Sequence, residues 1–216
     1  ERFVTDASLV TEPSQYHAIL EHERLTTLSW PYEWCFAQLQ DAAIFHLDLQ
    51  LSLLDDCVGL KDGSAFNVQF KNGRPIFIDA LSFIKYADGD FWLGYTQFCK
   101  EFLNPLLFTA YRRLPFNHWY RGTNDGLNSE DLIKMLPSLR KYHPSILLHV
   151  IAPAALNKRE LKSSKRSVVL SKKRKMNDGA YRFLLGSMRN LVSGLPDPQA
   201  QADSWLSYQS DCIYSD

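Results

Sequence analysis

The feature that most constrains this chain is a pair of short apolar runs separated by an Asn-Gly dipeptide. The runs cover residues 68–70 and 75–78, and Asn72-Gly73 lies between them. Asn-Gly between two apolar, β-prone runs is a strong signal for a tight hairpin turn. The sequence therefore predicts an antiparallel hairpin, in which the residue before the first strand and the residue after the second lie at one edge.

Three polar side chains are expected at that edge. Asn67 precedes the first strand, Asp79 ends the second, and Asp62 lies in the loop before them. Amide and carboxylate oxygens suit magnesium, and phosphoryl transfer from Mg-ATP uses a further carboxylate to orient and deprotonate the acceptor hydroxyl. We predict Asp62 as the catalytic base, Lys61 as a contact to the transferred phosphate, and Asn67 and Asp79 as magnesium ligands. The alternative is a buried hairpin whose turns are capped by Asp and Asn.

This Asp-Asn-Asp arrangement resembles the catalytic and metal-binding loops of protein-kinase-like folds. The resemblance implies an α+β, mostly α, fold: a kinase-like helical lobe with a small β-hairpin at the catalytic loop. The chain departs from the kinase pattern in three places. Leu60-Lys61 replaces His-Arg or His-Gly, Ala80-Leu81 replaces Phe-Gly, and Ser64 stands where many kinases carry a lysine. The motif therefore argues for the fold more strongly than for activity.

The N-terminal region lacks two residue types that a complete kinase fold needs. No glycine precedes Gly59 and no lysine precedes Lys61, whereas kinases use a glycine-rich loop and a strand lysine to hold the ATP phosphates. We expect an incomplete N-terminal lobe, or Arg2 or Arg24 in place of the lysine. Residues 14–29 are interpreted as a strand and its exit, corresponding to a hinge where Glu21, His22 and Glu23 meet the nucleotide.

The rest of the chain is dominated by helical patterns. Ser29 and Pro31 predict a helix start, and the apolar positions after Trp34 predict a long buried helix ending at Gly59. His46 within it is interpreted as a satisfied core residue. Pro105 is expected to kink or split the next helix. The further helices are expected over residues 91–111, 128–139, 144–151 and 181–195.

Composition limits the class of protein. A chain of 216 residues with 45% hydrophobic and 13% aromatic residues can bury a sizeable core. Its net charge of zero gives no whole-chain argument for a nucleic-acid or membrane partner, and no apolar run approaches the about 20 residues that span a bilayer. The scattered cysteines suit reduced, buried thiols in a cytoplasmic protein; they are Cys35, Cys57, Cys99 and Cys212.

A basic segment covers residues 158–175, where nine lysines and arginines accompany one acid, Glu160. Our first interpretation is a solvated loop between helices. The alternative is a patch for a phosphorylated or nucleic-acid partner, although the scarcity of aromatic residues argues against nucleic acid.

Several motifs resemble the N-terminal part of bacterial two-part proteins labelled SAM-dependent methyltransferases, some of them related to the nodulation protein NoeA. The matching stretches include residues 21–25, 32–36, 39–43, 60–62, 66–70, 77–83, 94–99 and 205–216. The resemblance implies three parts: residues 1–30 as the remnant of an N-terminal lobe and hinge, 31–195 as the kinase-like helical lobe, and 196–216 as a linker to a methyltransferase domain. SAM would bind only that further domain, because no strand followed by Gly-x-Gly occurs here.

Together these features predict a cytoplasmic domain that binds Mg-ATP and supports a linked methyltransferase, with phosphoryl transfer to an acceptor that the sequence does not name. Two other readings stay open. One is a pseudokinase that serves as an interaction or regulatory module. The other is a domain that presents substrate to the methyltransferase through the basic segment.

Overall fold

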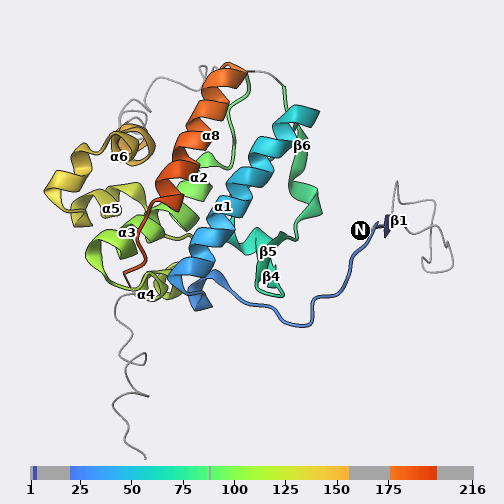
Figure 1. Cartoon of the computed structure of the whole chain (residues 1–216), viewed down its shortest axis with the longest axis horizontal. Coiled ribbons are helices and arrows are strands. Elements are labelled where there is room, and N and C mark those ends of the chain that lie inside the picture. The colour runs from blue at the N-terminus through green and yellow to red at the C-terminus, as the bar shows by residue number, and fades with distance from the viewer. Residues whose placement is uncertain (1, 4–19, 88, 156–175, 199–216) are drawn as a thin grey trace, which may run out of the picture.

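The computed structural model describes residues 2–3, 20–87, 89–155 and 176–198 (Figure 1). Within these residues helices form most of the fold, and the strands pair in three separate two-stranded antiparallel sheets. The predicted α+β, mostly helical class is therefore confirmed. The basic segment 158–175 and most of the expected linker lie outside the described residues. Among the helices described, none combines the length and apolar character needed to cross a bilayer.

Two long helices from opposite ends of the chain lie side by side, as Figure 1 shows: α1 (Phe36–Leu53) and α8 (Asp178–Ser193). The side-chain amide of Gln40 donates to the carbonyl oxygens of Val192 and Leu195, at 2.8 and 3.1 Å. Arg189 forms an ion pair with Asp48. These contacts fix the last described helix against the first, so the helical domain is closed across more than a hundred residues of intervening chain.

A continuous helix with a change of hydrogen-bond register crosses the core. It comprises α2 (Tyr95–Phe98), a π-helical turn (Cys99–Leu103) and α3 (Asn104–Arg112). Pro105 was expected to kink or split the helix, but it lies in the first turn of α3. In the preceding turn the Asn104 N–H already bonds to the carbonyl of Cys99, five residues earlier. The proline, which has no N–H to donate, therefore enters at a register change without ending the helix.

Shorter helices complete the helical layer around a core rich in aromatic side chains. The α-helices are α4 (Asn117–Gly122), α5 (Ser129–Met135) and α6 (Pro144–Ile146), and a second π-helical turn covers Leu147–Ile151. The 3₁₀ turns are Pro31–Glu33, Leu54–Asp56, Ala65–Asn67, Ala80–Ser82 and Ser138–Tyr142. The largest fully buried residues of the core include Trp34, Phe36, Leu39, Leu47, Phe98, Phe102, Phe116, Tyr120 and Tyr181.

The predicted hairpin is confirmed. The strands pair as β1 (Arg2–Phe3) with β2 (Leu20–Glu21), β3 (Val58–Leu60) with β6 (Phe83–Lys85), and β4 (Val68–Lys71) with β5 (Arg74–Phe77). In the last pair Val68 faces Phe77. Asn72 and Gly73 form the two-residue loop with φ of 52° and 74°. Two successive left-handed residues are the type I′ geometry that Asn-Gly favours.

The ends of α1 differ from the expectation. Ser29 does not cap the helix: its hydroxyl accepts from the indole of Trp34 at 2.9 Å, and α1 begins only after Cys35. The helix also stops at Leu53, well before Gly59, because Cys57 adopts a left-handed φ of 54° that turns the chain into β3. The apolar pattern continues through this change because β3 is itself buried, so periodicity alone could not mark the boundary.

The described cysteines are all free, and only Cys99 is buried. The expectation of buried thiols is therefore wrong for Cys35 and Cys57, which are exposed on either side of α1.

Candidate functional site

The loop that follows β3 is fixed to two neighbouring segments through its backbone. The Gln50 amide accepts from the N–H of Leu60 at 2.7 Å and donates to the Tyr181 hydroxyl at 2.9 Å. The N–H groups of the next two residues, Lys61 and Asp62, donate to the carbonyl and hydroxyl oxygens of Ser82, at 2.7 and 3.1 Å. The loop is thereby tied to α1 and α8 behind it and to the Ala80–Ser82 turn beside it.

Asn67 and Asp79 are in direct contact at the open end of the hairpin. The Asn67 amide donates to one Asp79 oxygen at 3.1 Å, and the other Asp79 oxygen accepts from the N–H of Leu81 at 3.1 Å. Both side chains are half-buried. A carboxylate has about four lone-pair positions and an amide oxygen has two, so acceptor capacity is left for a cation.

The backbone of Asp62 is bonded to the turn that follows Asp79. Its bond to Ser82 places the loop next to the segment that begins at Asp79, three residues earlier in the chain. Asp62 is half-buried, whereas Lys61 is exposed. The structure thus brings the Asp62 loop, Asn67 and Asp79 into one region of the surface.

The three residues predicted to contact the nucleotide, Glu21, His22 and Glu23, do not lie at the open end of the hairpin with Asn67 and Asp79. Glu21 belongs to β2 by its backbone, and His22 and Glu23 follow as exposed residues. The Glu23 carboxylate pairs with Lys71 at 2.6 Å, and this hydrogen bond holds the pKa of Glu23 below its ordinary value. Lys71 is at the turn end of β4, whereas Asn67 precedes its other end. The length of β4, at about 3.3 Å per residue, separates the two groups.

Glu101 is a buried carboxylate that accepts hydrogen bonds from the Asp62 loop and that the sequence did not reveal. Glu101, in the π-helical turn, accepts from the Ser64 hydroxyl and from the Ala65 N–H, both at 2.9 Å. One turn earlier, Gln97 accepts from the N–H of Gly63 at 3.1 Å. Burial raises the pKa of Glu101 above its ordinary value. Glu101 lies more than thirty residues after the loop, so no local pattern could have revealed it.

His46 lies under the same loop, in a cage of aromatic rings. Its ring is 5.6–5.8 Å from those of Phe77, Trp92, Phe98 and Phe102, between centroids. Burial lowers the pKa of His46 to about 4. The expected core position is confirmed. Neither ring nitrogen has a hydrogen bond of ordinary geometry in the described part of the chain, although the nearby backbone of Asp62 partly offsets the lowering of the pKa by burial.

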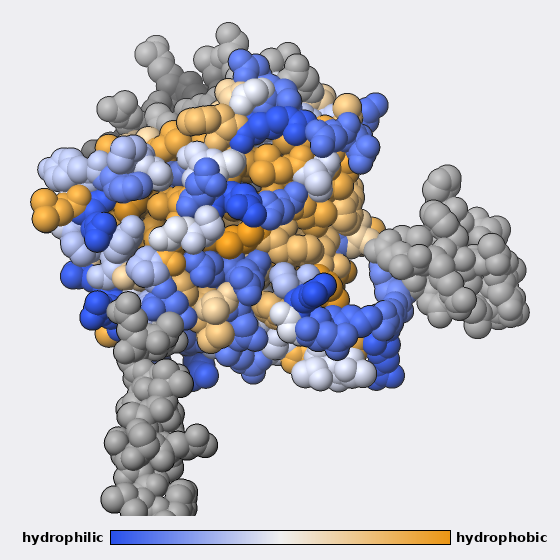
Figure 2. Space-filling model, viewed as in Figure 1, coloured by the Kyte–Doolittle hydropathy of each residue, from blue (hydrophilic) through white to orange (hydrophobic). Residues whose placement is uncertain are grey.

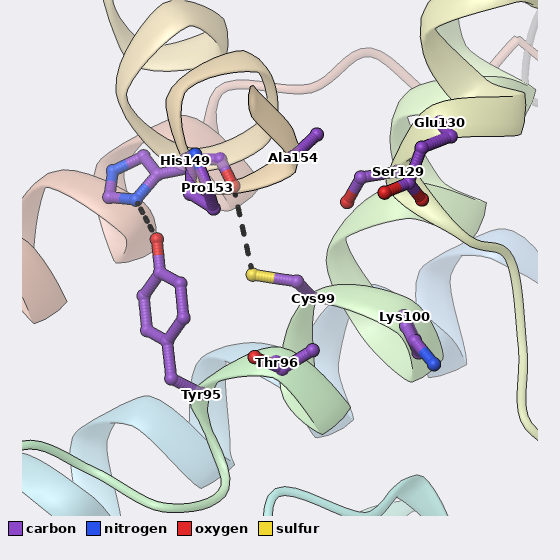
Figure 3. A pocket seen from close by; sticks show the side chains of 9 residues that line it. All are labelled: Tyr95, Thr96, Cys99, Lys100, Ser129, Glu130, His149, Pro153 and Ala154. Atoms are coloured by element: carbon purple, nitrogen blue, oxygen red, sulfur yellow. Dashed lines mark hydrogen bonds between the residues drawn. The ribbon is translucent and has the colours of Figure 1, made fainter. Parts of the chain in front are cut away.

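A second polar cluster lines a small pocket between α2, α5 and the Leu147–Ile151 turn (Figure 3). There the Tyr95 hydroxyl and His149 Nδ1 are 3.1 Å apart, and His149 Nε2 is 2.8 Å from the Ser187 hydroxyl. Burial lowers the pKa of His149 to about 4 and raises that of Cys99 to about 12. Because the histidine is neutral and the thiol is protonated, we interpret this cluster as a structural contact between three helices and not as a nucleophilic site. None of the predicted site residues lines this pocket.

The predicted magnesium site supplies few protein ligands. In the described ranges no three His, Cys, Asp or Glu side chains gather as a metal site. Asn67 and Asp79 offer one amide and one carboxylate. Magnesium fits such a pair, because it keeps several waters and is commonly held by one or two carboxylates together with substrate phosphates.

Comparison with known proteins finds a curated relative. The chain is 38% identical over 197 residues to nodulation protein NoeA of Rhizobium meliloti (strain 1021), which covers 91% of this chain and 41% of that protein. The chain thus spans about two fifths of the relative's length. No family model matches the chain, and no solved structure matches it. The sequence is therefore similar to part of NoeA over nearly its whole length.

Proposed function

We propose that this chain is a kinase-like domain that binds Mg-ATP and transfers a phosphoryl group to a hydroxyl acceptor. The observation that supports this best is the 3.1 Å contact between Asn67 and Asp79, next to a loop that carries Asp62 and is bonded to Ser82. An amide, a carboxylate and a further carboxylate in one region are the groups that such a reaction needs.

In this proposal each residue has a distinct role. Asn67 and Asp79 hold magnesium against the phosphates, and Asp62 accepts the proton of the acceptor hydroxyl. Lys61, exposed beside Asp62, contacts the transferred phosphate. Glu101 positions the loop without touching the substrate, since its carboxylate is buried and one of its oxygens accepts from both Ser64 and Ala65.

We further propose a longer protein, of a length like that of NoeA, in which this domain has a partner domain. We place the domain in the cytoplasm, in support of a linked methyltransferase that would bind SAM by itself. The chain matches only 41% of NoeA, which leaves room in a protein of that length for a further domain.

A pseudokinase is the second candidate. The departures from the kinase pattern favour it: Leu60-Lys61 replaces His-Arg or His-Gly, and Ala80-Leu81 replaces Phe-Gly. A domain with these changes can keep the fold as an interaction or regulatory module without phosphoryl transfer.

Nucleotide binding by the full-length protein separates the two candidates. We expect ATP to bind in the presence of magnesium, as measured by isothermal titration calorimetry, and binding to weaken at least tenfold when magnesium is removed. Asp79→Asn should abolish the magnesium dependence, because it removes the anionic ligand. Asp56→Asn is the matched control, since Asp56 is an exposed acid in the turn after α1.

Two results would count against phosphoryl transfer. If the parent protein binds no ATP with magnesium or manganese, the pseudokinase candidate is favoured. If Asp79→Asn and the parent bind ATP with equal affinity and equal magnesium dependence, Asp79 is not a ligand.

A further inference from the structure

Two stretches of the chain without acidic residues meet on the helical side of the domain. They are residues 102–124 and 132–155, and neither contains an Asp or a Glu. Their lysines and arginines are Arg112, Arg113, Arg121, Lys134, Arg140 and Lys141. The net charge of zero for the whole chain therefore conceals a local excess of positive charge.

One contact brings cations of the two stretches together. The Arg140 guanidinium lies over the ring of Tyr111, with its central carbon 4.9 Å from the ring centroid. Tyr111 is in the last turn of α3, and Arg112 and Arg113 follow it directly. Lys141 is next to Arg140 in the same 3₁₀ turn. Four cations are therefore grouped where α3 ends, and in the described ranges none of them forms an ion pair.

The acids next to these stretches lie near the other end of α3. In the described part of the chain they are Glu101, Asp125, Glu130 and Asp131. The N–H of Leu127 bonds to the carbonyl oxygen of Lys100 at 2.9 Å. Asn104 donates to the Ser129 hydroxyl at 3.1 Å. These bonds hold the acids near the start of α3, whose nine residues, at about 1.5 Å each, separate them from the cations at its end.

The Ser138–Tyr142 turn adds an apolar side beside the cations. Leu139 is 87% exposed and Tyr142 is 77% exposed. The N–H groups of Arg140 and His143 bond to the carbonyl oxygens three residues earlier, at 3.0 and 3.1 Å. Because side chains three positions apart in a 3₁₀ turn lie on the same side, Leu139 and Tyr142 share one side of this turn.

This turn lies at the margin of the helical layer. In Figure 1 the chain between α5 and α6 forms the margin of the domain opposite β6. Figure 2 shows protruding apolar surface next to hydrophilic surface there. We call this set the basic edge; it consists of Arg112, Arg113, Leu139, Arg140, Lys141 and Tyr142.

We propose that the basic edge binds the surface of a membrane that contains anionic phospholipids. The four cations contact lipid phosphates, and Leu139 and Tyr142 enter the boundary between headgroups and acyl chains. Such a surface attracts each nearby Lys or Arg by about fivefold in affinity, and tyrosine is enriched at this boundary. A nucleic acid also complements cations, but it offers little apolar surface to a leucine, so the exposure of Leu139 favours a membrane.

The basic edge shares no residue with the proposed ATP site. The proposal is therefore independent of phosphoryl transfer, and it is compatible with an active kinase and with a pseudokinase. The contact is peripheral, because a single turn enters the boundary and no element crosses the bilayer.

The test is cosedimentation of the full-length protein with vesicles of phosphatidylcholine alone, or of equal parts phosphatidylcholine and phosphatidylglycerol. We expect binding to the anionic vesicles to be more than about tenfold tighter and to weaken as salt screens the charges. Arg112→Gln and Lys141→Gln should each lower the affinity for anionic vesicles about fivefold. Leu139→Ser should lower it about tenfold, because a leucine that enters the boundary leaves water.

Two control variants match these changes. Leu81 is 90% exposed but lies in the Ala80–Ser82 turn, and Arg74 is an exposed cation in β5. Leu81→Ser and Arg74→Gln should leave the affinity for anionic vesicles unchanged. Because every variant is made in the full-length protein, any contribution of the basic segment 158–175 is the same in all of them.

Several results would overturn the proposal. They are the absence of vesicle binding, equal binding to the two kinds of vesicle, and binding that the variants of the basic edge leave unchanged or that the controls weaken equally. A random-sequence DNA oligonucleotide is tested in parallel. If Arg112→Gln and Lys141→Gln weaken binding to DNA while vesicles do not bind, the basic edge is a nucleic-acid site and the membrane proposal is refuted.

Discussion

Gly63 and Gly94 pack backbone against backbone. A Cβ added at Gly63 would lie 2.2 Å from the carbonyl oxygen of Gly94, and one added at Gly94 would lie 2.4 Å from the nitrogen of Gly63. Neither distance is compatible with a side chain, and the clashing atoms are backbone atoms that cannot move aside cheaply. This contact joins the Asp62 loop to the start of α2.

We therefore expect Gly63→Ala and Gly94→Ala each to destabilise the protein. Overpacking typically costs about 1–3 kcal/mol, and the short distances place both variants at the upper end or beyond. Gly186→Ala is the control, because a Cβ there meets nothing within 4 Å and Gly186 lies inside α8. It should stabilise by up to about 1 kcal/mol. Urea unfolding measures all three; a neutral Gly63→Ala would contradict the close approach.

The role proposed for Asp62 predicts that its replacement lowers turnover far more than ATP affinity. A general base acts mainly in the transition state. Asp62→Ala in the full-length protein should therefore keep ATP affinity within about twofold and lower turnover about a hundredfold to ten-thousandfold. The measurement is transfer of labelled phosphate, with Asp56→Ala as the control. An activity that Asp62→Ala leaves untouched would remove Asp62 from the mechanism.

Glu101 should make the free energy of unfolding fall as pH rises, whereas an acid in an ion pair makes it rise. Burial raises its pKa in the folded state, so its contribution is fully present below the unfolded value of about 4.5 and is lost as pH rises through the folded pKa. Glu101→Gln cannot ionise and should become more stable relative to the parent from pH 4.5 to pH 7. Glu101→Ala should cost about 1–3 kcal/mol, because Ser64 and Ala65 lose their acceptor.

The pH series is followed by urea unfolding. A difference between Glu101→Gln and the parent that stays constant over this range would show that the carboxyl has an ordinary pKa.

His46 predicts sensitivity to acid. Its pKa is lowered by burial to about 4 in the folded state and is about 6.5 in the unfolded chain. The stability it contributes is present above pH 6.5 and is lost as pH falls through 4, up to about 3 kcal/mol. His46→Leu should flatten the loss of unfolding free energy between pH 7 and pH 4. His143→Leu, at an exposed histidine, should not change that slope; equal slopes in all three proteins would refute the prediction.

Local sequence signals predicted the parts of the fold that depend on local physics. The Asn72-Gly73 turn predicted the hairpin correctly, because φ > 0 at both positions is favoured only by a few residue types. The boundaries of α1 could not be predicted, since the buried strand β3 continues the apolar pattern of the helix. The prediction that Pro105 kinks or splits its helix was wrong, because the effect of a proline depends on the hydrogen-bond register of the preceding turn.

The candidate site was predictable only where its members are close in sequence. Asn67 and Asp79 are joined by a hairpin, and their contact follows from its register. Gln50, Ser82 and Glu101 hold the Asp62 loop from segments that pack together only in the folded chain, so no spacing pattern identifies them. The kinase-like interpretation itself stays a prediction, because the hairpin and its polar edge test only a part of it.

The π-helical turn at Cys99–Leu103 affects the number of residues in the central helix as well as its shape. Gln97 and Glu101, which hold the Asp62 loop, precede or fall within the widened turn, whereas α3 follows it. The hydrogen bond of this turn spans five residues where a regular α-helix spans four, so the turn takes up one extra residue while the flanking helices keep nearly the same phase about the axis. Deleting that residue should therefore leave a regular α-helix whose α3 still turns the same face to the core. Homologous chains without it should differ mainly within the turn itself, at the Glu101 contacts to the loop.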